Sequence, residues 1–223
     1  MRFLQFIFPI LSAVLLTGCV EIIDDLTLNS DGSGSFKYNV NLSSSKIKIN
    51  SILALDSLDG KRVPSLDEMK QKITSLHEKL KLQPGISNAK LEADYTNFIF
   101  KFSCDFASIE DLQYAIKLIA ISENKGKPIP ELDHKWLIFS GTHLERSVPK
   151  ITLKKSKQIT AKDQLKLKEG TYTSITRFDK EIRAFNNDSA KLSTNKKAIM
   201  LRTDTYSLVQ NPRLLDNLID LKQ

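Results

Sequence analysis

Alternating apolar and polar positions predict several β-strands in this chain. The clearest run places four aromatic residues and one cysteine on a single face: Phe98, Phe100, Phe102, Cys104 and Phe106. A period of two is typical of a strand with one buried face. We therefore expect 97–106 to pair as a hairpin with 87–94. A second hairpin is predicted near the start, where the turn sequence Asn-Ser-Asp-Gly-Ser-Gly at 29–34 joins two alternating segments.

Apolar residues spaced three and four apart predict helices between these strands. One helix is expected to begin at the capping box Ser65-Leu66-Asp67-Glu68 and to end before Pro84-Gly85. Another is expected after Ser108, with an apolar stripe from Leu112 to Ala120. A weaker helix is predicted within 43–58.

The later half of the chain reads mainly as further strands, which we expect at 135–144, 172–178, 181–185 and 198–203. The lysine-rich stretch 150–168 predicts short strands or a connecting segment, and 211–221 leaves a final helix or a final strand open. Short hairpin links favour antiparallel pairing. The predicted fold class is therefore α+β, an antiparallel β-sheet of hairpins with helices packed on one side.

The front of the chain has the order of a bacterial lipoprotein signal peptide. Arg2 precedes an apolar stretch from Phe3 to Leu16, and Leu16-Thr17-Gly18-Cys19 resembles a lipobox. The alternatives are a transmembrane helix and a buried core helix, but the apolar stretch is shorter than the roughly 20 residues that a span needs, and it contains Pro9. We therefore expect residues 1–18 to be cleaved. Cys19 would then carry the lipid that attaches the mature protein to a membrane.

The mature part, 19–223, is long enough for one domain, and its polar segment 123–133 is the candidate boundary between two halves. The chain is 41% hydrophobic and 26% charged, which is typical of a folded protein, and its net charge is +7. A basic surface suits anionic lipid headgroups, and the candidate contacts are Lys154, Lys155, Lys157, Lys162, Lys166 and Lys168. The alternative is a solvated charged connection. No aromatic residues alternate with these lysines, so nucleic acid is not an expected partner.

No constellation in the sequence predicts catalysis, a metal or another cofactor. Ser43-Ser44-Ser45-Lys46 formally matches Ser-x-x-Lys, but the accompanying Ser-Asp-Asn and Lys-Thr-Gly motifs are absent from the sequence. The three histidines are scattered without metal-ligand spacing. With Cys19 acylated, Cys104 has no disulfide partner, and its place on the aromatic face predicts a buried thiol. We expect a protein that is not an enzyme.

Two stretches resemble LppM-like bacterial lipoproteins. Residues 21–34 are similar to the opening strand and Asp-Gly-x-Gly turn of that family, and 172–208 are similar to its closing strands. The resemblance implies an α+β domain of the cell envelope with lipid or glycolipid contact, and it brings no catalytic residues.

The sequence therefore favours a lipid-anchored bacterial envelope lipoprotein that binds a lipid, a glycolipid or an envelope protein. The alternatives are a structural or assembly subunit of an envelope complex and a hydrolase without a recognisable motif. Val20, rather than an aspartate, follows the lipid cysteine. By resemblance to the known sorting rule, this favours the outer membrane.

Overall fold

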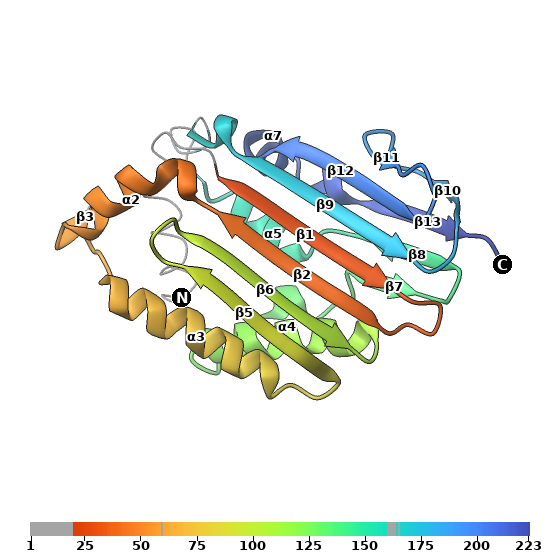
Figure 1. Ribbon diagram of the computed structural model, residues 1–223, viewed down its shortest axis with the longest axis horizontal. Helices are drawn as coiled ribbons and strands as arrows, with labels where there is room; N and C mark the ends of the chain where they lie inside the picture. Colours follow the sequence, from red (N-terminus) through yellow and green to blue (C-terminus); the bar gives the residue numbers. More distant parts are fainter. Residues whose placement is uncertain (1–19, 59, 160–163, 165) are drawn as a thin grey trace.

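The computed structural model describes residues 20–58, 60–159, 164 and 166–223 (Figure 1). In these residues a larger sheet has seven strands, in the order β11 (Lys191–Leu192), β12 (Ala198–Asp204), β9 (Thr171–Phe178), β1 (Glu21–Leu28), β2 (Gly34–Asn41), β6 (Ile99–Phe106) and β5 (Ile86–Asp94). A smaller sheet has the order β10 (Ile182–Phe185), β13 (Asn217–Leu221), β8 (His143–Arg146) and β7 (Leu137–Phe139). A short hairpin joins β3 (Ser57–Leu58) to β4 (Lys61–Arg62).

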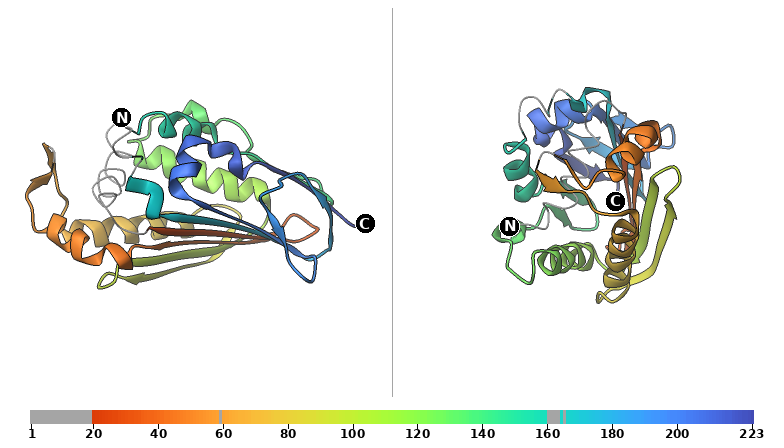
Figure 2. Two further views of the ribbon diagram at one scale, coloured as in Figure 1. Left: turned by 90° about the horizontal axis from the view of Figure 1, so that it is seen from above. Right: turned by 90° about the vertical axis from the view of Figure 1, so that its left-hand side faces the viewer.

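Helices and the smaller sheet form a second layer on one face of the larger sheet (Figure 2). The α-helices are α2 (Lys46–Leu53), α3 (Leu66–Lys81), α4 (Ile109–Glu123), α5 (Lys150–Ser156) and α7 (Thr205–Gln210). Short 3₁₀ helices are η1 (Ser43–Ser45), η2 (Pro130–Leu132), η3 (Lys166–Glu169) and η4 (Pro212–Leu215). The predicted α+β class is confirmed.

Strand β1 runs through the centre of the larger sheet between β2 and β9. It pairs antiparallel with β2, as the hairpin pattern predicts, but parallel with β9. This parallel pair departs from the expected hairpins because β9 reaches β1 through a long connection rather than a turn. Strands from both sides of 123–133 share the larger sheet.

The turn between β1 and β2 depends on two glycines. Gly32 has a φ of +88°, which side chains rarely tolerate. At Gly34 a Cβ atom would lie 2.0 Å from the carbonyl oxygen of Thr27. Both glycines of the predicted Asp-Gly-x-Gly turn are therefore needed. Gly32 is needed for its backbone conformation, and Gly34 is needed because the backbone of Thr27 lies so close.

The aromatic face of β6 is core. Phe100, Cys104 and Phe106 are buried, while Lys101 on the opposite face is exposed. Phe98 lies in the turn before β6 rather than in the strand, but it is also buried. These residues belong to two hydrophobic clusters, and the half-buried Phe102 packs against one of them.

Two segments take forms that the sequence left open or did not predict. Residues 150–156, expected as short strands or a connection, form helix α5 directly after Pro149. The chain end contains both η4 and strand β13. Helix α3 begins as predicted, because Ser65 Oγ accepts from the backbone N–H of Glu68 and Glu68 Oε2 accepts from that of Ser65.

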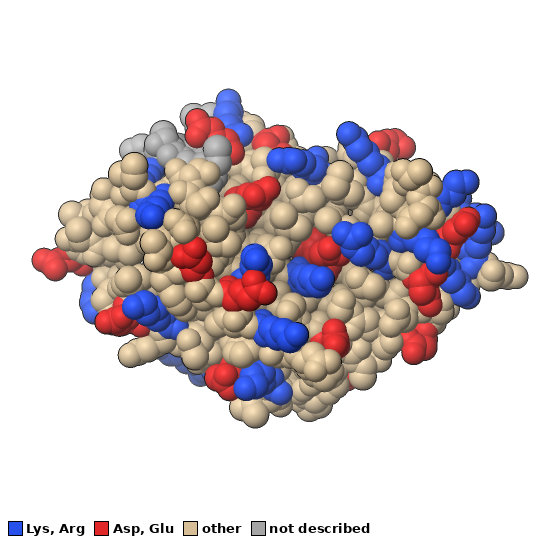
Figure 3. Space-filling model, viewed as in Figure 1, with Lys and Arg blue, Asp and Glu red and all other residues tan. Residues whose placement is uncertain are grey.

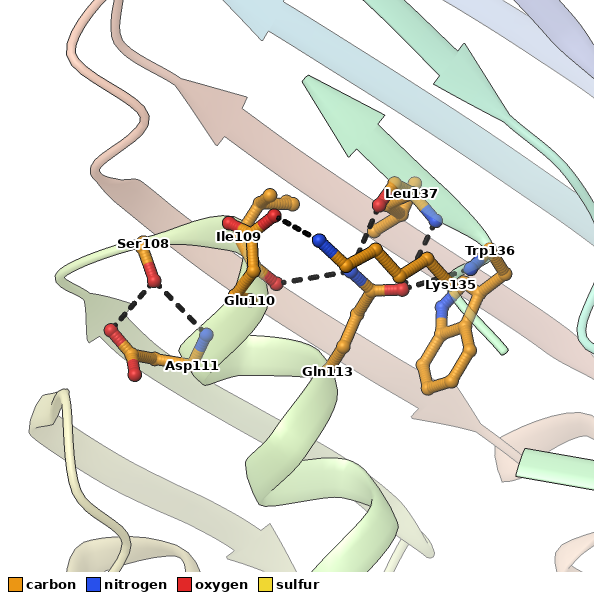
Figure 4. A network of polar contacts seen from close by, with 8 residues as sticks. All are labelled: Ser108, Ile109, Glu110, Asp111, Gln113, Lys135, Trp136 and Leu137. Atoms are coloured by element: carbon orange, nitrogen blue, oxygen red, sulfur yellow. Dashed lines mark hydrogen bonds and ion pairs between the residues drawn. The ribbon is translucent and has the colours of Figure 1, made fainter. Parts of the chain in front are cut away.

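A buried glutamine attaches helix α4 to the edge strand β7 (Figure 4). Gln113 Oε1 accepts hydrogen bonds from the backbone N–H groups of Trp136, at 2.9 Å, and Leu137, at 3.1 Å. Its Nε2 donates to the carbonyl oxygen of Leu137 at 2.9 Å. Gln113 thus supplies the backbone partners that a neighbouring strand would otherwise provide.

Gln113→Leu leaves buried backbone groups of β7 without partners. We expect a loss of about 2 kcal/mol or more in the free energy of unfolding, measured by urea denaturation. The control is Glu110→Ala, which removes the exposed ion pair with Lys135 and should cost less than about 1 kcal/mol. Equal losses in the two variants would contradict this role of Gln113.

Candidate functional site

The two adjacent aspartates of β1 point to opposite faces of the larger sheet. Asp25 lies on the outer face, where Arg177 Nε donates to it at 2.9 Å. Figure 3 shows this face with basic and acidic side chains interspersed. Asp24 points into the protein and is only 3% exposed. A carboxylate in that position requires hydrogen-bonding partners.

Asp24 connects the larger sheet to the smaller one. Arg146, on β8, donates through Nη2 to both carboxylate oxygens of Asp24, at 3.1 and 2.9 Å. From β9, Ser174 Oγ donates at 3.0 Å, and the Tyr172 hydroxyl also donates to Asp24. The carboxylate therefore has partners on both layers, and it compensates the charge of Arg146, whose side chain is 15% exposed.

This network changes the proton affinity of the groups around it. Burial acts to lower the pKa of Arg146, but the charge of Asp24 and the hydrogen bond to it raise that pKa overall. Burial, and then the charge of Asp24, raise the pKa of Tyr172 well above its ordinary value. The same two causes raise the pKa of Tyr38, on β2, to about 12. Both tyrosines are neutral at physiological pH.

Arg146 also borders a polar hollow of about 460 Å³, within the range of about 300–1,000 Å³ that is typical of small-molecule sites. The hollow is lined by Glu145, Arg146, Ser147, Asn186, Asn187, Asp188, Ser189, Asn211, Arg213, Leu214, Asp216, Asn217 and Leu218. A void of about 10 Å³ adjoins it and shares Arg146, Asn187 and Asn217 with it.

Asn217 is the lining residue that best indicates a ligand. It is 7% exposed, and its Oδ1 has no hydrogen-bond partner among the described residues. By contrast, Asn187 Nδ2 donates to the carbonyl oxygens of Leu214 and Asp216, at 2.9 and 2.8 Å. Buried acceptors are normally satisfied. The Oδ1 atom of Asn217 is thus a buried acceptor that no described residue satisfies, on a residue that lines both the hollow and the void.

The charges around the hollow do not favour an anion. Three acidic residues, Glu145, Asp188 and Asp216, line it together with two arginines. One of these arginines, Arg146, is already compensated by Asp24. A neutral ligand with many hydroxyl groups fits such a lining better than a phosphate or an acyl chain, because it can both donate and accept.

The structure does not gather the predicted lysines at this hollow. Lys154 and Lys155 lie on α5, with Lys157 at its C-cap, and Lys166 and Lys168 lie in η3. Lys154 pairs with the carboxylate of Glu131. Cys19 and Lys162 lie outside the described residues.

Sequence reasoning missed the residues of the hollow. Its amide groups come from the loop 186–189, from the segment around Asn211 and from the start of β13. The only signal was the Asn and Asp content of two loops, which is equally typical of ordinary turns.

Among the described residues, neither a metal site nor the thiol of Cys104 adds a second candidate site. They contain no cluster of His, Cys, Asp and Glu side chains that could hold a metal. Burial, and then the charge of Asp105, raise the pKa of Cys104 to about 11, so its thiol is protonated. The buried position predicted for Cys104 is confirmed. Within the described part of the chain, no helix has the length and apolar character needed to cross a membrane.

The chain was compared with family models, with curated protein sequences and with solved structures, and only the solved structures gave a match. No family model matches the chain, and no curated protein sequence matches it. Among solved structures it is similar to the folded domain of LppM from Mycobacterium tuberculosis, determined by NMR, with a TM-score of 0.45 and 8% identity over 93% of each chain. That protein belongs to the family that 21–34 and 172–208 resemble.

The raised pKa of Tyr38 predicts a loss of stability in alkali. The folded protein holds this proton up to a pH of about 12, whereas the unfolded chain releases it near 10. The contribution of Tyr38 to stability is therefore complete below pH 10 and is lost as the pH rises from 10 to 12. In urea denaturation at pH 9 and pH 11, we expect Tyr38→Phe to lose less stability than wild type between the two values. Tyr114→Phe, at an exposed tyrosine, should behave like wild type, and equal losses in all three proteins would refute the prediction.

Proposed function

We propose that this protein is a lipoprotein of the bacterial cell envelope, anchored through Cys19, whose folded domain binds a neutral polar headgroup without catalysing a reaction. A glycolipid is the ligand class that we favour, because its sugar hydroxyl groups match the lining of the hollow. We place the protein at the outer membrane, with the acyl chains of Cys19 as its attachment.

The start of the fold supports the proposed anchor. Val20 is buried, its carbonyl oxygen accepts from the backbone N–H of Thr171 at 2.7 Å, and β1 begins at Glu21. The residue that follows the cysteine of the predicted lipobox is therefore already part of the fold. Two or more acyl chains on that cysteine are enough for stable attachment.

The unpartnered Oδ1 of Asn217 is the observation that carries the proposed binding function. It lies beside Arg146 in a hollow whose side chains are mainly polar. Binding of a hydroxyl group there would satisfy a buried acceptor, and the adjoining charges would exclude an anionic competitor. The proposed contacts with anionic headgroups are Lys154, Lys155, Lys157, Lys162, Lys166 and Lys168.

A second candidate, an assembly subunit, is favoured by two exposed apolar side chains on the smaller sheet. Leu218 and Ile138 are 41% and 43% exposed, and both lie opposite Glu145 across neighbouring strands. They therefore stand on either side of Glu145, which is itself exposed, in one row across the sheet. A partner protein would cover this row.

Native mass spectrometry of the full protein, purified in mild detergent from its own cell envelope, tests the proposed function. We expect covalent acyl mass on wild type that is absent from Cys19→Ala, and a retained glycolipid mass that Asn217→Leu loses. Gln71→Leu, on the exposed side of α3, is the control and should retain the ligand. Acylated protein that is free of ligand in every variant would contradict the binding function and favour the assembly subunit.

A further inference from the structure

The start of helix α5 is bound by a histidine from another part of the chain. His134 lies between η2 and β7, and its Nε2 atom accepts a hydrogen bond of 3.3 Å from the backbone N–H of Lys150. Pro149, the residue before the helix, provides no side-chain cap. His134 therefore satisfies an N–H group that the first turn of a helix leaves without an internal partner.

This hydrogen bond exists only while the imidazole ring of His134 is neutral. A backbone N–H donates and cannot accept, so Nε2 must carry a lone pair and the ring proton must be on Nδ1. Protonation of Nε2 would place a second N–H against that of Lys150. The Nδ1 atom is buried and has no hydrogen-bond partner among the described residues. An imidazolium at this position would thus have two donors and no well-placed acceptor for either.

The charges around His134 also disfavour the imidazolium. Burial, and then the charge of Lys150, lower the pKa of His134 below its ordinary value of 6.5, and the backbone of Glu131 opposes this only in part. The charged residues nearest to His134 in the sequence are already paired, as Glu131–Lys154, Asp133–Lys117 and Lys135–Glu110. No free carboxylate among them is left to stabilise a positive ring.

Helix α5 depends on contacts of this kind because it is short. Its seven residues are well below the roughly 12 that an isolated helix needs. Its other contacts include Ile151, which packs against the hydrophobic cluster that contains Trp136, and the ion pair of Lys154 with Glu131. An exposed ion pair adds little stability. Loss of the hydrogen bond to His134 should therefore increase the unwound fraction of α5.

We propose that His134 makes α5 sensitive to acid: the neutral ring holds the start of the helix, and protonation of the ring releases it. Because the pKa of His134 is lowered in the folded protein, its contribution to stability is present above pH 6.5 and is lost as the pH falls through the pKa of the folded state. This response requires neither a ligand nor the anchor. Helix α5 also contacts η4, which lines the polar hollow, so acid would act beside the proposed binding site.

Nuclear magnetic resonance of the full protein in mild detergent tests this role of His134. At pH 7.5 the ring ¹⁵N shifts should show a protonated Nδ1 and an unprotonated Nε2. Between pH 7.5 and pH 5.0, the ¹³Cα shifts of Lys150–Ser156 should lose about a third or more of their helical displacement. The midpoint of that loss should coincide with the titration of His134 and lie below pH 6.5.

Two variants separate His134 from other effects of acid. His134→Gln keeps an acceptor, Oε1, at every pH, so its α5 shifts should not change between pH 7.5 and pH 5.0. His143→Gln, the control, replaces a partly exposed histidine that pairs with Asp220, and it should respond like wild type. A ring protonated on Nε2 at pH 7.5, a wild-type helix unaffected by the titration of His134, or equal changes in wild type and His134→Gln would overturn the proposal.

Discussion

The buried ion pair between Asp24 and Arg146 is the contact on which the arrangement of the two sheets depends. Asp24 stands on the central strand of the larger sheet, and Arg146 stands on the smaller sheet. A buried pair adds little net stability compared with apolar packing, but removal of one partner leaves a buried charge and is costly. We infer that the pair selects how the layers, which also share a hydrophobic cluster, face one another. Since Arg146 also borders the polar hollow, the same contact places the proposed binding site.

The local features of the fold could be predicted from the sequence, and the long-range ones could not. The alternation in β6 and the capping box at Ser65 depend on neighbouring residues, so their patterns are visible in the chain. The parallel pairing of β1 with β9 joins Glu21 to Thr171, and no short pattern encodes such a contact. The lysines of α5 followed no clear periodicity, and the helix there was not expected.

The candidate site shows the same division. The sequence predicted lysines as contacts because they are clustered along the chain. In the structure, however, Lys154 forms an ion pair with Glu131. Asn217 has no distinguishing neighbours in the sequence, and its importance comes from its burial beside Arg146. Asp24 and Asp25 look equivalent in the sequence. Only the directions of the two side chains show that Asp24 binds Arg146 between the sheets and that Asp25 forms an ion pair on the surface.

A double-mutant cycle on Asp24 and Arg146 tests most directly whether this pair holds the two sheets together. The free energy of unfolding would be measured in urea for Asp24→Leu, Arg146→Leu and the double variant. Each single variant should lose about 3–5 kcal/mol, because it leaves the other charge buried and unpaired. The double variant should lose at least about 2 kcal/mol less than the sum of the two. Losses that add to within about 0.5 kcal/mol would contradict a direct coupling between the sheets through this pair.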